Sequence, residues 1–470
     1  MRKTKIVCTI GPASDSEIML EKLIRAGINV ARLNFSHGSQ ESHSQTIQKI
    51  RAVSDKLQQP IAILQDLAGP KIRIGNIESG SILLQPEQIF TLTIEDVKGD
   101  QNQVSVSYDK LPDDVQVKDR ILLADGGIEL EVVAKDARTV TTRVKIGGEL
   151  SSRKGLNLPT SSLSVQALTE KDEHDLIFGL QQGVDYVAMS FVRRREDLLQ
   201  VKQIMKNEKA LSPIIAKIEK HEALENIDDI IAEADGIMVA RGDLAVETPL
   251  EKVPLVQKMI IRKCNEVGKP VITATQMLKS MVDNPRPTRA ETNDVANAVL
   301  DGTDAVMLSE ETTIGQFPVE SVKTMVKIIQ VTESSNTAKL QMLPPKYDEP
   351  SSIEHAVSHG AFEIARDLKA TAIFTPTQSG TTARMVSTYR PTQPIIAFSP
   401  NFQVVRCLNL VWGVHPLLTK AYSNSEEMIE QAKNLALSLD LVKKGEIVIV
   451  TAGIPVGVTG TTNLIKVEKI

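Results

Sequence analysis

The chain has 470 residues, of which 41% are hydrophobic and 24% charged, and its formal net charge is -5. This length exceeds one ordinary core, so we expect two or three globular domains without extended disorder. The negative charge and an aromatic content of 3% disfavour a nucleic-acid-binding protein, which would present a basic face and stacking rings, so the expected partners are small molecules.

Three cysteines, Cys8, Cys264 and Cys407, are far apart and form no Cys-x-x-Cys pair. Neither a disulfide framework nor a zinc knuckle is indicated, and a reducing compartment fits this pattern. The N-terminal residues pass from three cations directly into a strand pattern, without an apolar stretch of signal-peptide or membrane length. We therefore expect a cytoplasmic protein with no membrane partner.

Short β-branched runs alternate with helical patterns along most of the chain, which is typical of parallel βα units. Amphipathic segments such as 16–26, 251–266 and 289–300 separate the expected strands. These strands are 5–10, 29–35, 60–67, 186–191, 213–219, 235–244, 270–276 and 304–310. Eight such units close a (β/α)8 TIM barrel, so the predicted fold class is α/β.

A change of pattern after the third strand predicts an inserted domain. Residues 69–154 contain short alternating strands at 88–94, 103–108, 120–123 and 129–134, separated by turn signals. We expect a small β-barrel here, inserted into a barrel domain made of residues 1–68 and 155–335. A predicted helix at 170–180 resumes the alternation of strands and helices. Because the insertion follows the C-terminal end of a barrel strand, it would form a lid that brings Asp125 to the site on closure.

The C-terminal part predicts a third domain. The sequence turns polar and proline-bearing between Glu333 and Pro350, which indicates a linker, and residues 350–470 read as an α/β domain. A strand at 371–375 runs through a Ser- and Thr-rich loop into a helix. Hydroxyls and N–H groups of the loop would form an anion site, whose residues are Thr377, Ser379, Gly380, Thr381 and Thr382. An ordinary turn capped by Ser and Thr is the alternative.

Polar residues interrupt the apolar barrel strands at their C-terminal ends. Lys217 and Glu219 lie two apart on one strand, so both side chains point the same way, and Asp243 ends the next strand, where it can share a cation with Glu219. The others are Arg32, Asn34, Asp66, Arg241, Thr273, Thr275, Ser309 and Glu311. This end is the active face of a TIM barrel, so a lysine beside two carboxylates outlines a phosphoryl-transfer site. Any single one of these residues could instead be structural.

The order and spacing of several motifs resemble those of bacterial pyruvate kinases over essentially the whole chain. They include Arg32-Leu-Asn-Phe-Ser-His-Gly38, Gly69-Pro-Lys-Ile-Arg73, Ile214-Ile-Ala-Lys-Ile-Glu219 and Ala240-Arg-Gly-Asp-Leu244. The resemblance implies transfer of the phosphoryl group of phosphoenolpyruvate to ADP, giving pyruvate and ATP in the last step of glycolysis. It also implies a homotetramer with cooperative substrate binding.

The resemblance assigns roles to single residues near the substrate. Glu219 and Asp243 would hold Mg²⁺, with Mn²⁺ as the alternative, because hard oxygen ligands suit these ions. Lys217 would neutralise the phosphoryl group in transfer, and Arg32 would clamp it. The backbone N–H groups of Gly242 and Asp243 would receive the substrate carboxylate, and Thr275 would bind it and help to position a proton donor that the resemblance does not identify.

ADP is expected between the barrel and the inserted domain, together with a second Mg²⁺. The implied nucleotide-binding residues are Asn34, His37, Arg73 and Lys154. Potassium-requiring members carry glutamate where this chain has Lys71, while the residual monovalent-cation ligands are Asn34, Ser36, Asp66 and Leu67. The ammonium of Lys71 would supply the charge that K⁺ supplies elsewhere, so we expect no K⁺ requirement.

The resemblance further implies that the loop at Thr377–Thr382 holds the phosphate of an allosteric effector. The stretch 453–460 differs from the loop that binds a bisphosphate sugar in animal and yeast relatives, so we expect a sugar monophosphate or AMP. Two alternatives stay open. One is another phosphoenolpyruvate-handling or aldol-type barrel enzyme, because one fold hosts many chemistries, and the other is a catalytically silent metabolite sensor, against which the intact Lys217, Glu219 and Asp243 argue.

Overall fold

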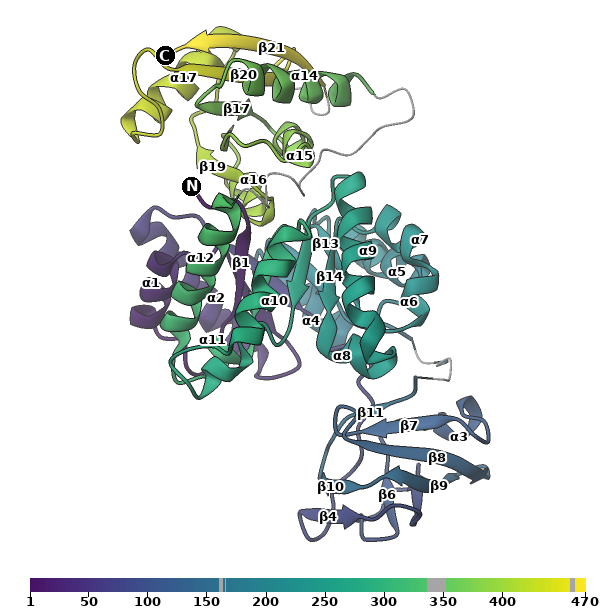
Figure 1. Cartoon of the computed structure of the whole chain (residues 1–470). Coiled ribbons are helices and arrows are strands. Elements are labelled where there is room, and N and C mark those ends of the chain that lie inside the picture. The colour runs from purple at the N-terminus through teal and green to yellow at the C-terminus, as the bar shows by residue number, and fades with distance from the viewer. Residues whose placement is uncertain (160–163, 165, 336–351, 457–460) are drawn as a thin grey trace.

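The computed structural model describes residues 1–159, 164, 166–335, 352–456 and 461–470. The C-terminal domain, a barrel and the inserted domain follow one another along the long axis of the molecule (Figure 1). Residues 336–350 of the expected linker, residue 351 and residues 457–460 of the stretch 453–460 lie outside the described residues.

Eight parallel strands close the central barrel, in the order β1-β16-β15-β14-β13-β12-β3-β2. The strands are β1 (Lys5–Thr9), β2 (Val30–Asn34), β3 (Ala62–Asp66), β12 (Tyr186–Met189), β13 (Ile214–Ile218), β14 (Gly236–Ala240), β15 (Val271–Ala274) and β16 (Ala305–Leu308). Their residues are almost all buried, as expected for strands covered on both faces. The predicted TIM barrel is therefore confirmed.

Helices surround the barrel, and the longer ones bury an apolar face. They are α1 (Glu17–Ala26), α2 (Gln40–Leu57), α4 (Glu170–Gln181), α5 (Arg195–Asn207), α6 (Glu222–Glu225), α7 (Ile227–Glu233), α8 (Arg241–Glu247), α9 (Val253–Glu266), α10 (Arg289–Leu300), α11 (Glu310–Thr313) and α12 (Pro318–Ser334), with short 3-10 turns η1 (Leu250–Lys252) and η2 (Lys279–Val282). Local signals fix several ends: Ser16 caps α1, and Thr288 and Glu291 form a capping box at α10.

The expected strand 235–244 is wrong in its second half. Strand β14 stops at Ala240, and Arg241 begins helix α8 without an intervening loop. The first turn of a helix leaves its backbone N–H groups without intrahelical partners. This early switch therefore places the N–H groups of Gly242 and Asp243 at the mouth of the barrel, which a continued strand would not do.

The inserted domain contains a six-stranded sheet in the order β11-β7-β8-β9-β5-β6 and a two-stranded sheet that pairs β10 with β4. Residues 72–75 connect the two edges of the larger sheet, because Arg73 bridges to Gly155 beside β11 and Ile74 bridges to Val106 beside β6. This segment closes the sheet in the manner of the small β-barrel that we expected. The elements are β4 (Ser81–Leu84), β5 (Ile89–Thr93), β6 (Gln103–Ser105), α3 (Leu111–Asp114), β7 (Arg120–Leu123), β8 (Ile128–Lys135), β9 (Thr139–Ile146), β10 (Gly148–Ser151) and β11 (Leu156–Asn157).

The chain leaves the barrel at Gly69 and returns to it beyond Leu158. Gly69 has a φ of +68°, and a Cβ atom there would come within 2.6 Å of Phe191, so only glycine fits this exit. On the return, β11 pairs with β7, and Leu156 and Leu158 belong to the core of the inserted domain. The inserted domain thus extends past the boundary at residue 154 that the sequence pattern predicted.

The C-terminal domain has a five-stranded sheet in the order β19-β18-β17-β20-β21, with only β21 antiparallel. Its elements are α14 (Ile353–Asp367), β17 (Ala372–Pro376), α15 (Thr381–Thr388), β18 (Ile395–Ser399), α16 (Phe402–Cys407), η3 (Leu408–Leu410), β19 (Val414–Leu418), α17 (Ser425–Ser438), β20 (Ile447–Gly453) and β21 (Thr462–Lys469). This α/β architecture confirms the prediction.

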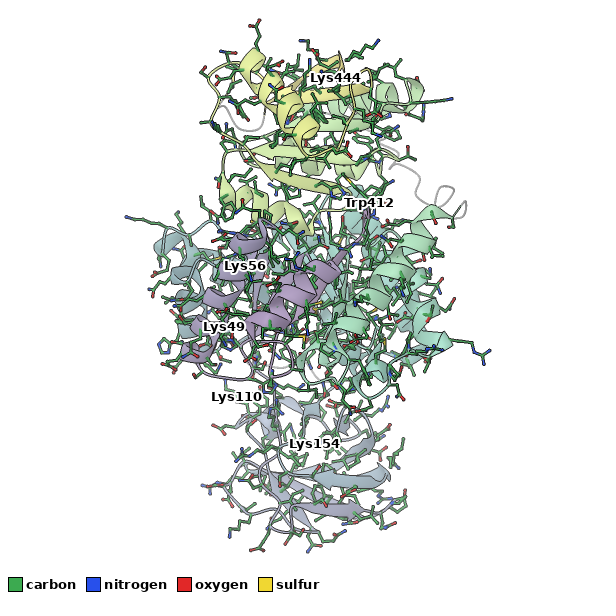
Figure 2. All side chains as sticks on the ribbon, turned by 90° about the vertical axis from the view of Figure 1, so that its left-hand side faces the viewer. Lys49, Lys56, Lys110, Lys154, Trp412 and Lys444 are labelled. Atoms are coloured by element: carbon green, nitrogen blue, oxygen red, sulfur yellow. The ribbon has the colours of Figure 1, made fainter. Side chains whose placement is uncertain are left out.

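The C-terminal domain docks on the barrel at the end opposite the inserted domain (Figure 1). Leu410 joins the buried residues that fill the barrel interior, and Arg390 forms an ion pair with Asp304, in which both side chains are buried. Trp412 lies at this joint, and Lys154 lies in the inserted domain (Figure 2). Among the helices described, none has the length and apolar character needed to cross a bilayer.

Candidate active site

The C-terminal ends of the barrel strands surround a cavity of about 770 Å³. Eight of the residues expected at the active face or in the site line it, namely Arg32, Asn34, His37, Lys217, Glu219, Asp243, Thr275 and Ser309. A second cavity of about 1010 Å³ lies between barrel and inserted domain; Asp243 and Thr275 line both. Gly242, Lys71 and Asp125 also line this second cavity, so Asp125 already faces the active end of the barrel.

Lys217 lies at the centre of the buried charges in the site. Its Nζ is 2.9 Å from Oε1 of Glu219 and 3.1 Å from Oδ1 of Asp66, and it donates a hydrogen bond of 2.6 Å to Oγ of Ser190. Ser190 was not among the expected site residues, although it follows β12 at its C-terminal end as the others follow their strands. These contacts hold the ammonium toward the cavity.

The three charged groups change one another's acidity. Burial alone would lower the pKa of Lys217, but Asp66 and Glu219 outweigh it and hold that pKa above its usual value. Burial and the charge of Asp243 raise the pKa of Glu219 despite the opposing effect of Lys217. Burial would also raise the pKa of Asp66, yet Arg32 and Lys217 bring it below its ordinary value. Lys217 is therefore charged at neutral pH.

Arg32 projects from β2 into the same cavity. Its Nε is 2.6 Å from Oδ2 of Asp66, and its Nη1 donates a hydrogen bond of 2.8 Å to Oγ1 of Thr9. Asp66 is fully buried, and it pairs with both Arg32 and Lys217. One buried carboxylate orients both positive groups, which is a suitable arrangement for an anionic phosphoryl group.

The first turn of α8 forms the opposite wall. The N–H of Gly242 donates a hydrogen bond of 2.8 Å to Oγ1 of Thr275, and Thr275 has a φ of +67°, which is unusual for a β-branched residue. Arg241 holds this turn in place, since its Nη1 lies 2.6 Å from Oδ1 of Asp294 and its Nη2 donates to the carbonyl of Thr275. The strained backbone at Thr275 is a common property of functional sites.

Glu219 and Asp243 fit a hard divalent cation. Both line the 770 Å³ cavity, and the charge of Asp243 helps to raise the pKa of Glu219, so the two carboxylates repel each other there. Two oxygen ligands that repel in this way are stabilised by a cation between them. Within the described part of the chain, no cluster of three or more His, Cys, Asp or Glu residues forms a metal site by itself, so a bound ion would take further ligands from substrate and water.

Lys71 lies elsewhere than we expected. Its Nζ is 3.8 Å from Oδ1 of Asp243, whereas we expected it among Asn34, Ser36 and Asp66. Asp66 already pairs with Arg32 and Lys217, and the carbonyl of Leu67 accepts a hydrogen bond from Ser190. The chain turns away from the barrel at Gly69, which carries Lys71 toward the inserted domain and α8.

The expected nucleotide residues fall on both sides of the opening. Asn34 and His37 line the barrel cavity, and the side chain of Asn34 accepts a hydrogen bond of 3.1 Å from the N–H of Ser36. Arg73 and Lys154 lie on the inserted domain, where the Nη1 of Arg73 donates to the carbonyl of Arg153, and neither lines the two cavities. The structure therefore brings together only the barrel half of this set.

The five residues of the expected effector loop lie together at the start of α15. Gly380 has a φ of +83°, and its N–H donates a hydrogen bond of 2.9 Å to Oγ1 of Thr377. The hydroxyls of Ser379 and Thr381 are 2.9 Å apart, and that of Thr382 is 2.8 Å from the hydroxyl of Thr462. Several polar groups of the loop thus bind one another.

Fold and site together define a TIM-barrel phosphotransferase, and comparison with known proteins gives its family. The models of "Pyruvate kinase, barrel domain" and "Pyruvate kinase, alpha/beta domain" match residues 1–322 and 355–468. The chain is 49% identical to the pyruvate kinase of Geobacillus stearothermophilus over 472 residues, which cover all of this chain and 80% of the relative. It is 47% identical to the Staphylococcus aureus (strain MRSA252) enzyme over 474 residues, covering 100% and 81%.

Pyruvate kinase 2 of Synechocystis is 49% identical over 473 residues, covering 100% of this chain and 79% of the relative. Matches of this extent reach every part of the fold described above. This chain belongs to the pyruvate kinase family, which confirms the resemblance of its motifs.

Proposed function

We propose that the protein transfers the phosphoryl group of phosphoenolpyruvate to ADP, giving pyruvate and ATP. The observation that carries this proposal is the position of Lys217, whose ammonium is held by two carboxylates and faces a cavity lined by Arg32, Asp243 and Thr275. The two cations neutralise charge on the migrating phosphoryl group, which is the main task of protein side chains in this chemistry.

A divalent ion, Mg²⁺ or Mn²⁺, would be held by Glu219 and Asp243. When bound, it supplies Lewis-acid stabilisation of the negative charge that develops on substrate oxygens. The mutual repulsion of the two carboxylates in the cavity supports this assignment. The N–H groups at the start of α8 would bind the substrate carboxylate, and the hydroxyl of Thr275, now paired with Gly242, would take part in the same contact.

The nucleotide would bind between barrel and inserted domain, with a second Mg²⁺, against Asn34, His37, Arg73 and Lys154. Asp125 of the inserted domain lines the cavity on that side, which supports a closing motion that excludes water. Lys71 would replace K⁺ by presenting a fixed positive charge to this cavity. Its ion pair with Asp243 supports an action beside the metal, although we expected it among Asn34, Ser36, Asp66 and Leu67.

The loop of Thr377, Ser379, Gly380, Thr381 and Thr382 would bind a phosphorylated allosteric effector, a sugar monophosphate or AMP. The positive φ of Gly380 and the hydroxyls gathered at the N-terminus of α15 support this role. We further propose a cytoplasmic homotetramer. Titration of the enzyme with ribose 5-phosphate, glucose 6-phosphate and AMP should shift substrate half-saturation, and unchanged saturation curves with all three would favour a simple capped turn.

A coupled assay of pyruvate formation from phosphoenolpyruvate, ADP and Mg²⁺ tests the main activity. We expect turnover that requires all three components. Binding of phosphoenolpyruvate without pyruvate formation would instead support the alternative of a silent metabolite sensor.

A further inference from the structure

A buried cluster outside the 770 Å³ cavity, at the edge of the 1010 Å³ cavity, connects three parts of the molecule. Its centre is Glu247, the last residue of α8, whose side chain is 1% exposed. Oε1 of Glu247 is 2.6 Å from Nζ of Lys220, which directly follows Glu219 in the chain. The same Oε1 accepts a hydrogen bond of 2.9 Å from Nδ2 of Asn157. Oε2 lies 3.7 Å from Nδ1 of His221.

These partners come from elements with different tasks. Lys220 and His221 follow β13, and Glu247 ends the helix whose first turn carries Gly242 and Asp243. Asn157 belongs to the inserted domain, because β11 pairs with β7 and its neighbours Leu156 and Leu158 lie in that domain's core. The Asn157–Glu247 bond is therefore a direct polar link between the inserted domain and α8.

The Glu247 carboxylate is a charged hydrogen-bond acceptor in this setting. Burial would raise its pKa, but His221, Lys220 and Asn157 hold that pKa below its usual value, so the group is ionised at neutral pH. A hydrogen bond from a neutral amide to a buried carboxylate is stronger than one between neutral groups.

We propose that Glu247 is a positioning residue. Through its hydrogen bond from Asn157, it holds the base of the inserted domain against α8, the helix whose first turn would bind the substrate. This inference rests on the proposed function and adds to it. When the inserted domain closes, nucleotide bound to it would then meet the substrate in a defined geometry, because the base of that domain and helix α8 are joined at one carboxylate. Small errors in the relative position of two reactants are costly in rate.

The test replaces the donor on the inserted domain and leaves the Lys220–Glu247 pair intact. Asn157→Ala removes the amide, and Asn157→Asp keeps its shape while replacing the N–H donor by an oxygen that repels Glu247. Asn102→Ala is the matched control, since Asn102 is an exposed amide of the same domain. Steady-state kinetics give kcat and the KM for each substrate, calorimetry without ADP gives the affinity for phosphoenolpyruvate with Mg²⁺, and thermal midpoints report folding.

We expect both Asn157 variants to raise the KM for ADP and to lower kcat, each by about tenfold, the loss of one hydrogen bond to a charged group. The affinity for phosphoenolpyruvate should change less than about threefold, because the barrel retains all its groups. Equal losses for both substrates, kinetics like those of Asn102→Ala, or unfolding of both variants would overturn the proposal. Turnover of the unaltered protein tests the proposed function by itself. The role of Glu247 is tested separately, by the ratios of kcat and KM between each variant and the unaltered protein.

Discussion

Lys217 on strand β13 and Asp66 on strand β3 form an ion pair with 3.1 Å between Nζ and Oδ1. Strand β12 lies between their strands, and its Ser190 accepts from Lys217 and lies 3.4 Å from Asp66. The other oxygen of Asp66 holds Arg32 at 2.6 Å. One buried carboxylate therefore orients both cations of the site, although it need not contact the substrate itself.

Replacing Asp66 by Asn should disturb both cations at once. The amide keeps the shape but removes the charge that Arg32 and Lys217 share, so the KM for phosphoenolpyruvate should rise about tenfold or more, the typical cost of losing charged hydrogen bonds. Steady-state kinetics with varied phosphoenolpyruvate measure this. Asp55→Asn, at an exposed position of α2, serves as the control. A KM equal to that of the control would show that Asp66 does not orient Arg32.

Asp243→Asn tests the metal assignment. Loss of one anionic ligand should raise the Mg²⁺ concentration needed for half-maximal rate by about tenfold or more, the range seen when a group that supports a metal is changed. The rate is measured over a Mg²⁺ titration at saturating substrates. The same titration with Asp294→Asn separates ligand loss from movement of α8, because Asp294 holds Arg241 outside the cavity. Identical Mg²⁺ curves for Asp243→Asn and the unaltered enzyme would place the metal elsewhere.

Lys71 should make the enzyme independent of K⁺. In buffer free of sodium and potassium, added KCl is expected to change the rate less than about tenfold, or 1.4 kcal/mol in activation free energy. Lys71→Glu should lower the rate in this buffer, since it places a carboxylate beside Asp243, and KCl should restore part of it. Strong activation of the unaltered enzyme by KCl would refute the proposed substitution of an ammonium for the ion.

Lys5 should make the free energy of unfolding depend on pH between neutral and alkaline values. Its side chain is buried and donates to the carbonyl of Val414, and burial together with Arg2 lowers its pKa from 10.5 to about 7, despite Glu333 and Asp304. Between pH 7 and 10.5, Lys5 is protonated in the unfolded chain but mostly neutral in the folded protein. Its contribution to the free energy of unfolding therefore rises with pH through that window.

The matching variant is Lys5→Met, which cannot titrate. Its advantage in thermal midpoint over the unaltered protein should be largest at pH 7 and should decline toward pH 10, corresponding to a free-energy change on the order of 3 kcal/mol. Scanning calorimetry of both proteins at several pH values measures the difference. A difference that stays constant over this range would mean that Lys5 titrates normally in the folded state.

The barrel could be predicted from the sequence because its signals are local. Buried β-branched runs such as those in β13 and β15 mark strands by themselves, and polar residues at their ends mark the active face. The alternating residues of β9 in the inserted domain carry an equally local signal. The switch from β14 to α8 at Arg241 had no comparable marker, since Arg-Gly-Asp-Leu is compatible with either state.

Contacts between distant segments could not be predicted in the same way. The ion pair of Lys71 depends on the direction in which the chain leaves Gly69, and the Asn157–Glu247 bond depends on how two domains meet. The buried pair of Arg390 and Asp304 likewise joins residues 86 positions apart. Such partners follow from tertiary packing, which single-sequence patterns do not encode.

The replacement of Lys217 by Met tests the central claim most directly. Turnover and the calorimetric affinity for phosphoenolpyruvate with Mg²⁺ are measured side by side, with Lys444→Met, on the far C-terminal domain (Figure 2), as the control. If the ammonium neutralises the phosphoryl group in transfer, turnover should fall by about a thousandfold, while affinity changes less than about tenfold. Equal losses in turnover and affinity, or unchanged turnover, would contradict the account.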